Sequence, residues 1–210
     1  MGNKSIFVLL AGGKSKRMGV AKGLLKYKQT YWILEQLNRI SKTTISEVYI
    51  GLGYNYQHYF DAIPWFENGL ENFVDFQGMK IKVILNKNPE MGSFSTLQTV
   101  LTAIDSTKNI ILNPIDIPIL NSTELAKLIS TENEIVIPTF EGKNGHPIKM
   151  NCEFWQQLLL LNVNDESARL DSQIKKINPI KISNIEVLDN AILKNLNTKI
   201  TWISFLNETH

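Results

Sequence analysis

The stretch SIFVLLAGGKSKRMGVAKGLLKY, from Ser5 to Tyr27, joins a short apolar run to a glycine turn that is rich in positive charge. The run is six residues long and rich in Ile, Val and Leu, which is typical of a buried strand. Gly12 and Gly13 follow it, where the backbone can turn sharply and approach a ligand without a Cβ in the way. The stretch therefore predicts a strand that ends in a ligand-binding turn.

Apolar runs and amphipathic segments alternate along the rest of the chain. Strands are expected at 5–10, 47–53, 81–86, 109–116 and 134–140, and helices at 31–41, 94–104 and 122–130. Ser122 or Thr123 is the expected N-cap of the last helix. Such alternation predicts an α/β fold of three layers, α/β/α, with a doubly wound and mostly parallel sheet. Ligands of these folds bind beyond the carboxyl ends of the strands.

Length and composition limit the classes of protein that the chain can belong to. The 210 residues predict one domain spanning 1–210, and a formal charge of +2 argues against a nucleic-acid binder. The apolar run near the start is too short for a membrane span or a signal peptide. Cys152 is the single cysteine, so no internal disulfide can form, and a buried thiol in a cytoplasmic protein is expected.

The segment 55–79 is irregular and rich in aromatic residues. It could form a helix and a loop that cover a site, or a surface connection with its own small hydrophobic cluster, and we favour the second. Trp32, Trp65, Trp155 and Trp202 are expected to pack rather than to stack on a ligand.

The glycine turn is followed by Lys14, Lys16, Arg17 and Lys22. Backbone N–H groups in such a turn, together with lysine and arginine, bind phosphate oxygens well. The spacing fits neither a P-loop nor the G-x-G-x-x-G of a dinucleotide fold. From the charges alone, a polyphosphate site and a solvated basic turn both remain open.

The whole stretch resembles the L-A-[AG]-G-x-S-x-R-M-G-x-x-K-x-L-L signature of sugar-nucleotide-type nucleotidyltransferases. More narrowly, it is similar to the MobA-like NTP transferases, the guanylyl- and cytidylyltransferases of the molybdenum cofactor. The resemblance implies a Rossmann-like fold of the nucleotide-diphospho-sugar transferase type and a nucleotide-binding loop. The loop positions it implies are Leu10, Ala11, Gly12, Gly13, Lys14, Ser15, Arg17, Met18, Gly19 and Lys22.

Three later segments resemble the family in the same order. NPEMGSFSTLQTVL (88–101) resembles the G-M-x-x-S-L segment near the nucleotide base, and it implies roles for Ser93 and for Thr96, where serine is usual. NPIDIPIL resembles the D-x-P motif and supplies Asp116, which by its position could also merely cap a turn. GKNGHPIKM resembles the G-x-x-G-H-P loop of the cytidylyltransferase branch.

That last loop implies an acceptor-binding role for Gly145, His146 and Pro147. A purely structural hydrogen bond would explain the presence of His146 in this loop almost as well.

The tail AILKNLNTKITW resembles a segment usually written I-L-x-D-I-D-T-P-E-D, but Asn195 and Asn197 stand in the two aspartate places. The resemblance implies that Asp116 and one tail residue hold Mg²⁺, with Mn²⁺ as a substitute. The carbonyl oxygen of Asn197 can coordinate such a cation but brings no charge. We therefore expect weaker metal binding than with aspartate, and loss of activity stays open.

The resemblance implies a Mg²⁺-dependent nucleotidyltransferase that moves an NMP from an NTP to a phosphorylated acceptor such as molybdopterin and releases pyrophosphate. Arg17, Lys22 and Asp116 would be its catalytic residues. The G-H-P loop favours CTP narrowly over the GTP that the L-A-G-G loop suggests. Contact with a molybdoenzyme or its chaperone is also implied.

Two alternatives stay open. One is a nucleotide-binding accessory protein of molybdenum-hydroxylase maturation or purine catabolism that has lost catalysis, as Asn195 and Asn197 suggest. The other is an oxidoreductase, against which the missing dinucleotide fingerprint counts.

Overall fold

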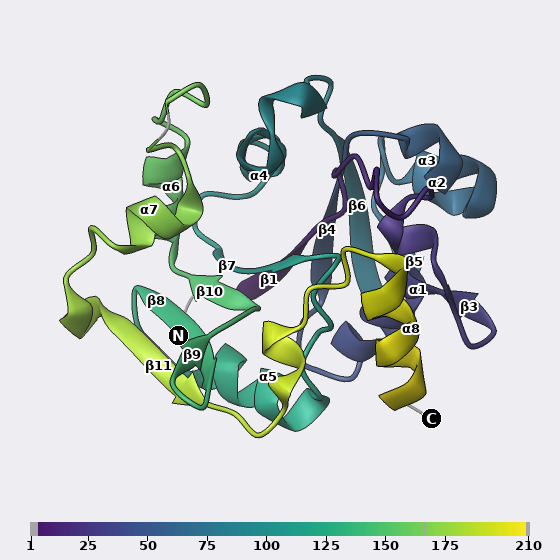
Figure 1. Cartoon of the computed structure of the whole chain (residues 1–210). Coiled ribbons are helices and arrows are strands. Elements are labelled where there is room, and N and C mark those ends of the chain that lie inside the picture. The colour runs from purple at the N-terminus through teal and green to yellow at the C-terminus, as the bar shows by residue number, and fades with distance from the viewer. Residues whose placement is uncertain (1–3, 166, 209–210) are drawn as a thin grey trace.

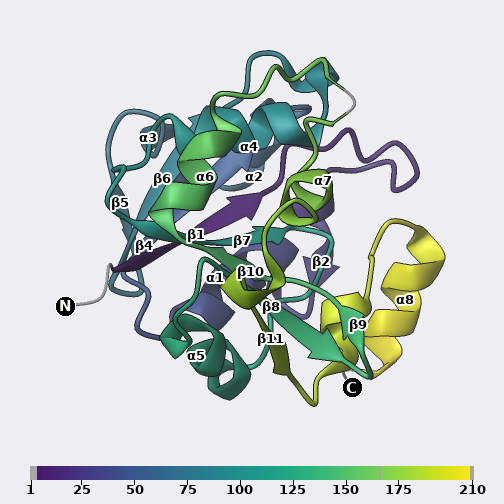
Figure 2. The same ribbon diagram turned by 90° about the vertical axis from the view of Figure 1, so that its left-hand side faces the viewer.

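The computed structural model describes residues 4–165 and 167–208, which form a mixed nine-stranded sheet between two layers of helices (Figures 1 and 2). The strand order is β11-β8-β10-β7-β1-β4-β6-β5, with β9 paired to β8. The strands are β1 Ser5–Leu10, β4 Glu47–Leu52, β5 Val74–Phe76, β6 Met79–Leu85, β7 Asn109–Pro114, β8 Ile135–Phe140, β9 Lys143–Asn144, β10 Ile148–Met150 and β11 Ile182–Glu186; a separate hairpin consists of β2 Lys26–Tyr27 and β3 Thr30–Tyr31.

Strand direction brings the loops of interest to one edge of the sheet. β1 runs parallel to β4 and β7, and β4 runs parallel to β6. β10 is antiparallel to both β7 and β8, so β8 has the same direction as β7. The carboxyl ends of β1, β4, β6, β7 and β8 therefore share one edge, which is where ligands of open α/β sheets bind.

Helices cover both faces of the sheet because successive side chains of a strand point to opposite faces. On β1, Phe7 and Leu9 face one core while Ile6 and Val8 face the other. The first core is covered by α1 Trp32–Ile40, α2 Tyr56–Ala62, α3 Trp65–Asn68, α5 Ser122–Ser130 and α8 Lys199–Glu208, and the second by α4 Ser93–Leu101, α6 Cys152–Leu158 and α7 Leu170–Ile174. Four 3₁₀ turns are η1 Lys22–Leu24, η2 Pro89–Met91, η3 Pro179–Lys181 and η4 Asn190–Leu193.

The expected α/β fold with a mostly parallel sheet is confirmed. All five expected strands and three expected helices are present, with ends within three residues of the expected ones. The antiparallel β10 was not expected, since three residues give too little periodicity to recognise. The expected N-cap was wrong: Asn121 caps α5, and its side-chain oxygen accepts from the N–H of Glu124 at 3.0 Å.

The interpretation of 55–79 as a surface connection with a separate cluster was wrong. The segment forms α2, α3 and β5, and Tyr59, Phe60 and Phe66 belong to the main core. The tryptophans pack as expected: Trp32, Trp155 and Trp202 are buried, and the ring of Trp65 lies against Phe66. No helix within 4–165 and 167–208 has the length and apolar character that a membrane crossing requires.

Candidate functional site

The loop between β1 and η1, residues 11–21, is fixed at its start by the end of β4. The N–H of Ala11 donates to Gly51 O at 2.8 Å, and the N–H of Tyr54 donates to Gly12 O at 3.1 Å. A Cβ on Gly12 would lie 3.0 Å from Thr96 Oγ1 and 3.2 Å from the backbone N of Gly53. Gly12 is therefore needed because α4 and the chain after β4 close on the loop from two sides.

Beyond Gly12 the loop presents unused hydrogen-bond donors. The N–H groups of Met18 and Gly19 both donate to Ser15 O, and Ser15 itself has a φ of +51°. Across the described chain, the N–H groups of 13–17 form no hydrogen bond, and the exposed cations Lys16 and Arg17 form no ion pair. A turn of free N–H groups with adjacent cations is a binding site for an anion.

Several positions expected at the nucleotide have side chains that are buried in this structure. Ala11, Met18 and Thr96 are buried, and Leu10 is half-buried. Ser93, by contrast, is exposed at the first residue of α4. The Ser93 side chain can therefore reach a ligand, whereas the buried positions can act only through their backbone or by packing.

Asn86 was missed by the sequence analysis, although it ends the expected strand 81–86. It is buried, and its amide Nδ2 donates to Ser95 Oγ at 2.8 Å and to Thr96 Oγ1 at 3.0 Å. Its Oδ1 accepts from the N–H of Asn88 at 2.9 Å. Asn86 therefore fixes the start of α4 against Gly12, and its place at the carboxyl end of a strand was the available signal.

Lys22, Asp116 and Asn197 meet at the centre of the site. The Lys22 ammonium Nζ lies 2.7 Å from Asp116 Oδ2 and also donates to Asn197 Oδ1. The Asn197 amide in turn donates to Asn195 Oδ1. The side chains of Lys22 and Asp116 are 16% and 18% exposed, so the contact is shielded yet reachable from solvent.

The turn that carries Asp116 is held by three neighbouring segments. Asn113 Nδ2 donates to the carbonyls of Pro114 and Ile117, each at 2.8 Å. Trp32 Nε1 donates to Ile115 O at 2.7 Å, and the N–H of Leu196 donates to Asp116 O at 2.8 Å. The last of these bonds ties the tail segment to the turn after β7.

The helix α8 keeps Asn197 in place through an aromatic cluster of Tyr27, Trp32, Trp202 and Phe205. The ring of Trp202 lies 5.3 Å from that of Trp32 and 6.4 Å from that of Tyr27, between ring centroids. Phe205 lies 5.3 Å from Trp32 and stacks on Tyr27 at 6.2 Å. The yellow α8 of Figure 1 is thereby docked on the start of α1 and the β2–β3 hairpin.

Gly145, His146 and Pro147 lie after the β8–β9 hairpin and against η4. The N–H of His146 donates to Ile192 O at 3.4 Å, and a Cβ on Gly145 would lie 2.5 Å from that same oxygen. Burial lowers the pKa of His146 to about 4, against the opposing effect of the Asp116 charge. The imidazole beside Asp116 is therefore neutral at pH 7.

The donor set at the centre of the site fits a hard divalent cation. Asp116 Oδ2 and Asn197 Oδ1 both contact one ammonium group, so the two oxygens converge on a position where a cation fits. Mg²⁺ and Mn²⁺ prefer such oxygen ligands, and Mg²⁺ keeps several waters. No group of three His, Cys, Asp or Glu side chains that could hold a metal occurs in 4–165 and 167–208. The carboxylate of Asp116 is thus the principal charge available to a metal.

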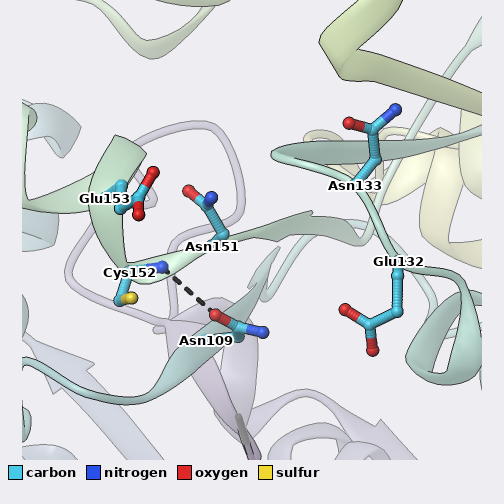
Figure 3. A pocket seen from close by; sticks show the side chains of 6 residues that line it. All are labelled: Asn109, Glu132, Asn133, Asn151, Cys152 and Glu153. Carbon is cyan, nitrogen blue, oxygen red and sulfur yellow. Dashed lines mark hydrogen bonds between the residues drawn. The ribbon is translucent and has the colours of Figure 1, made fainter. Parts of the chain in front are cut away.

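A separate hollow lies at the opposite edge of the sheet (Figure 3). Its lining includes Asn109 at the amino end of β7, and the N–H of Cys152 donates to Asn109 Oδ1 at 3.1 Å. Cys152 is half-buried at the first residue of α6 and packs against the second core, so this thiol is less buried than expected. None of the expected site residues lines this hollow.

The fold is shared with several solved structures. A nucleotidyl transferase from Methanothermobacter thermautotrophicus is 16% identical, with a TM-score of 0.74 over 100% of both chains. Rv0371c from Mycobacterium tuberculosis H37Rv is 19% identical, with a TM-score of 0.76 over 99% of both chains. A complex of Rv0371c with manganese is 17% identical, with a TM-score of 0.71, over 97% of this chain and 98% of that one.

No curated protein sequence matches the chain. Residues 7–177 match the MobA-like NTP transferase domain, and the chain therefore belongs to this family.

Proposed function

We propose that the protein transfers an NMP from an NTP to a phosphorylated acceptor and releases pyrophosphate, with Mg²⁺ or Mn²⁺ as its cation. CTP is the preferred nucleotide ahead of GTP, and a molybdopterin-type phosphate is the acceptor. The observation that carries this proposal is the meeting of Lys22 and Asp116 at the end of a loop with unused N–H donors. Family membership supports the use of an NTP.

The loop and its cations account for binding of the triphosphate. The N–H groups of 13–17 and the exposed Arg17 suit the β- and γ-phosphates, since they have no partner in the described chain. Ser93 would contact the base or ribose, and its exposed position at the start of α4 supports this role. Met18 and Thr96 act as support beneath these groups.

The transfer step needs no general base. The acceptor phosphate is mostly ionised at pH 7, because its second pKa lies near 6. Its oxygen forms a bond to the α-phosphorus while the bond from that phosphorus to the bridging oxygen of the β-phosphate breaks, and pyrophosphate leaves with the electron pair. Lys22 stabilises the charge that develops on the α-phosphate oxygens.

Asp116 and Asn197 are the residues that would hold the metal ion. When bound, such an ion neutralises phosphate charge and orients the reacting oxygens. The neutral His146 and the rigid backbone of Gly145 and Pro147 form the acceptor side, where an uncharged imidazole can hydrogen-bond an anionic acceptor. This arrangement leaves positioning and charge neutralisation as the main catalytic effects.

The proposal is tested by incubating the purified chain with CTP, GTP, ATP or UTP, Mg²⁺ or Mn²⁺, and molybdopterin, and by measuring pyrophosphate. We expect metal-dependent release with CTP above GTP, and loss of release in Lys22→Met and Asp116→Asn. Arg17→Gln should weaken nucleotide binding. If the Asp116→Asn variant released pyrophosphate as fast as the wild type, the assignment of Asp116 would be refuted.

A second candidate is a nucleotide-binding accessory protein without catalysis. Asn195 and Asn197 favour it, because both tail positions lack the negative charge that a metal would use. The two candidates differ in a simple way. If the wild type binds nucleotide but releases no pyrophosphate from any NTP, and if Asn197→Asp gains pyrophosphate release, the accessory-protein candidate is supported.

A further inference from the structure

We propose that Lys22 is an internal counter-cation that occupies the metal position, so that a free divalent ion binds poorly until a nucleotide draws the ammonium away. Metal and nucleotide then bind together rather than separately. This inference rests on the proposed function, since it assumes that one site takes both. It concerns how access to that site is controlled.

The contacts of the ammonium group support this role. Lys22 Nζ lies 2.7 Å from Asp116 Oδ2 and contacts Asn197 Oδ1, and these are the two oxygens that a metal would use. Two cations cannot share these oxygens at contact distance, because a divalent ion and an ammonium group repel each other. A metal ion at this position therefore requires Lys22 to move.

The charges around the contact make displacement by a free metal ion unfavourable. Asp116 supplies one negative charge and Lys22 one positive charge, while Asn195 and Asn197 are neutral. Among these four side chains Asp116 is the one anionic ligand, and the Lys22 ammonium already neutralises it, so a free metal ion must first break this ion pair.

The loop supplies the means of moving Lys22. Its backbone N–H donates to Ser15 Oγ at 3.3 Å, which ties the residue to the turn with the unused N–H groups. Phosphates bound on that turn would lie beside the start of the Lys22 side chain and offer its ammonium several negative oxygens. Because linkage is reciprocal, a nucleotide that opens the metal position must itself bind more tightly when metal is present.

The test is an electron paramagnetic resonance titration of the full chain with Mn²⁺, without nucleotide and with the α,β-methylene analogue of CTP. The wild type should bind Mn²⁺ weakly alone and at least tenfold more tightly with the analogue. Lys22→Gln should bind Mn²⁺ at least tenfold more tightly than the wild type without any nucleotide. Repulsion from an ammonium 4 Å away corresponds to about a factor of thirty for a divalent ion even in bulk water.

Two further variants complete the design. Lys28→Gln removes an exposed cation on the β2–β3 turn and should leave Mn²⁺ binding unchanged. Asn197→Asp keeps Lys22 and adds a carboxylate, so it should bind Mn²⁺ more tightly than the wild type in the absence of nucleotide. This variant takes the place of Lys22→Gln in the titration if Lys22→Gln does not fold.

Wild-type binding of Mn²⁺ as tight as that of Lys22→Gln, in the absence of nucleotide, would overturn the inference. Failure of the proposed function is recognised separately by equilibrium dialysis. If the wild type does not retain the CTP or GTP analogue at any Mn²⁺ concentration, the function is refuted, while the nucleotide-free comparison still decides whether Lys22 blocks the metal position.

Discussion

Trp202→Ala is expected to release α8 from the body of the protein and to loosen the tail segment that contacts Asp116. Trp202 is 7% exposed, and its ring contacts Tyr27, Trp32 and Phe205. Removal of the indole leaves a void beside three other aromatic rings. Because α8 begins two residues after Asn197, the loss should also affect the position of Asn197 at the site.

The size of the effect follows from the buried area. An aromatic side chain buries about 150–250 Å², which at about 25 cal/mol per Å² gives an upper bound of about 4–6 kcal/mol. Substitutions of buried Phe or Trp by Ala usually cost about 3–5 kcal/mol. We expect a loss of about 3 kcal/mol in the free energy of unfolding, since α8 lies at the edge of the core and its surroundings can partly collapse.

Urea denaturation followed by circular dichroism measures the loss, and amide hydrogen exchange locates it. The N–H of Leu196, which donates to Asp116 O at 2.8 Å, should exchange faster in Trp202→Ala. Ile203→Ala is the matched control, because Ile203 is the next residue of α8 and is 56% exposed. A loss below about 1 kcal/mol, or equal losses in the two variants, would show that the aromatic cluster does not hold α8.

Two other predictions concern the frame of the site, and a third concerns a buried lysine at the opposite edge of the sheet. Gly145→Ala should cost about 1–3 kcal/mol of stability and reduce acceptor affinity, because the new Cβ would lie 2.5 Å from Ile192 O. Urea denaturation measures the loss of stability, and titration with the acceptor measures the loss of affinity. Burial holds the folded-state pKa of His146 at about 4, below the unfolded value near 6.5, so the contribution of His146 to stability should be constant above about pH 7.5 and fall by about 2.5 kcal/mol by pH 4.5. His146→Gln should lose that part of the pH dependence in parallel urea titrations. The buried Lys149 ammonium donates to Ile129 O at 2.8 Å and to Thr131 O at 2.6 Å. Lys149→Met should therefore lower the free energy of unfolding by about 1–3 kcal/mol, because both carbonyls lose their donor. An unchanged urea midpoint would contradict this.

The strands and helices that set the fold could be predicted because each has a complete local pattern. β1 is a continuous apolar run that is buried from both faces, and α5 has apolar residues at helical spacing. Patterns of this kind depend only on neighbours in the sequence. The edge at which the loops meet then follows from strand direction, so the gathering of Gly12 and Asp116 could also be expected.

What the sequence could not provide is the direction of individual side chains. Thr96 belongs to a motif near the nucleotide, yet it points at Gly12 and accepts from Asn86. Short elements without periodicity, such as β10, and the burial of 55–79 were decided by tertiary packing instead. The contact of Lys22 with Asn197 depends on where α8 docks, which no local pattern encodes.

The contact of Lys22 with Asn197 spans 175 positions of the chain, and its contact with Asp116 spans 94. A ribosome delivers these parts in order, the loop first and the tail last, and contacts between distant positions form late in folding. In a nascent chain the loop 11–21 is therefore made well before the amide of Asn197 and the helix α8 that pack around Lys22 and Asp116. A chain that stops before Asn197 therefore lacks the amide that contacts Lys22 and the aromatic side chains of α8 that pack on Tyr27 and Trp32.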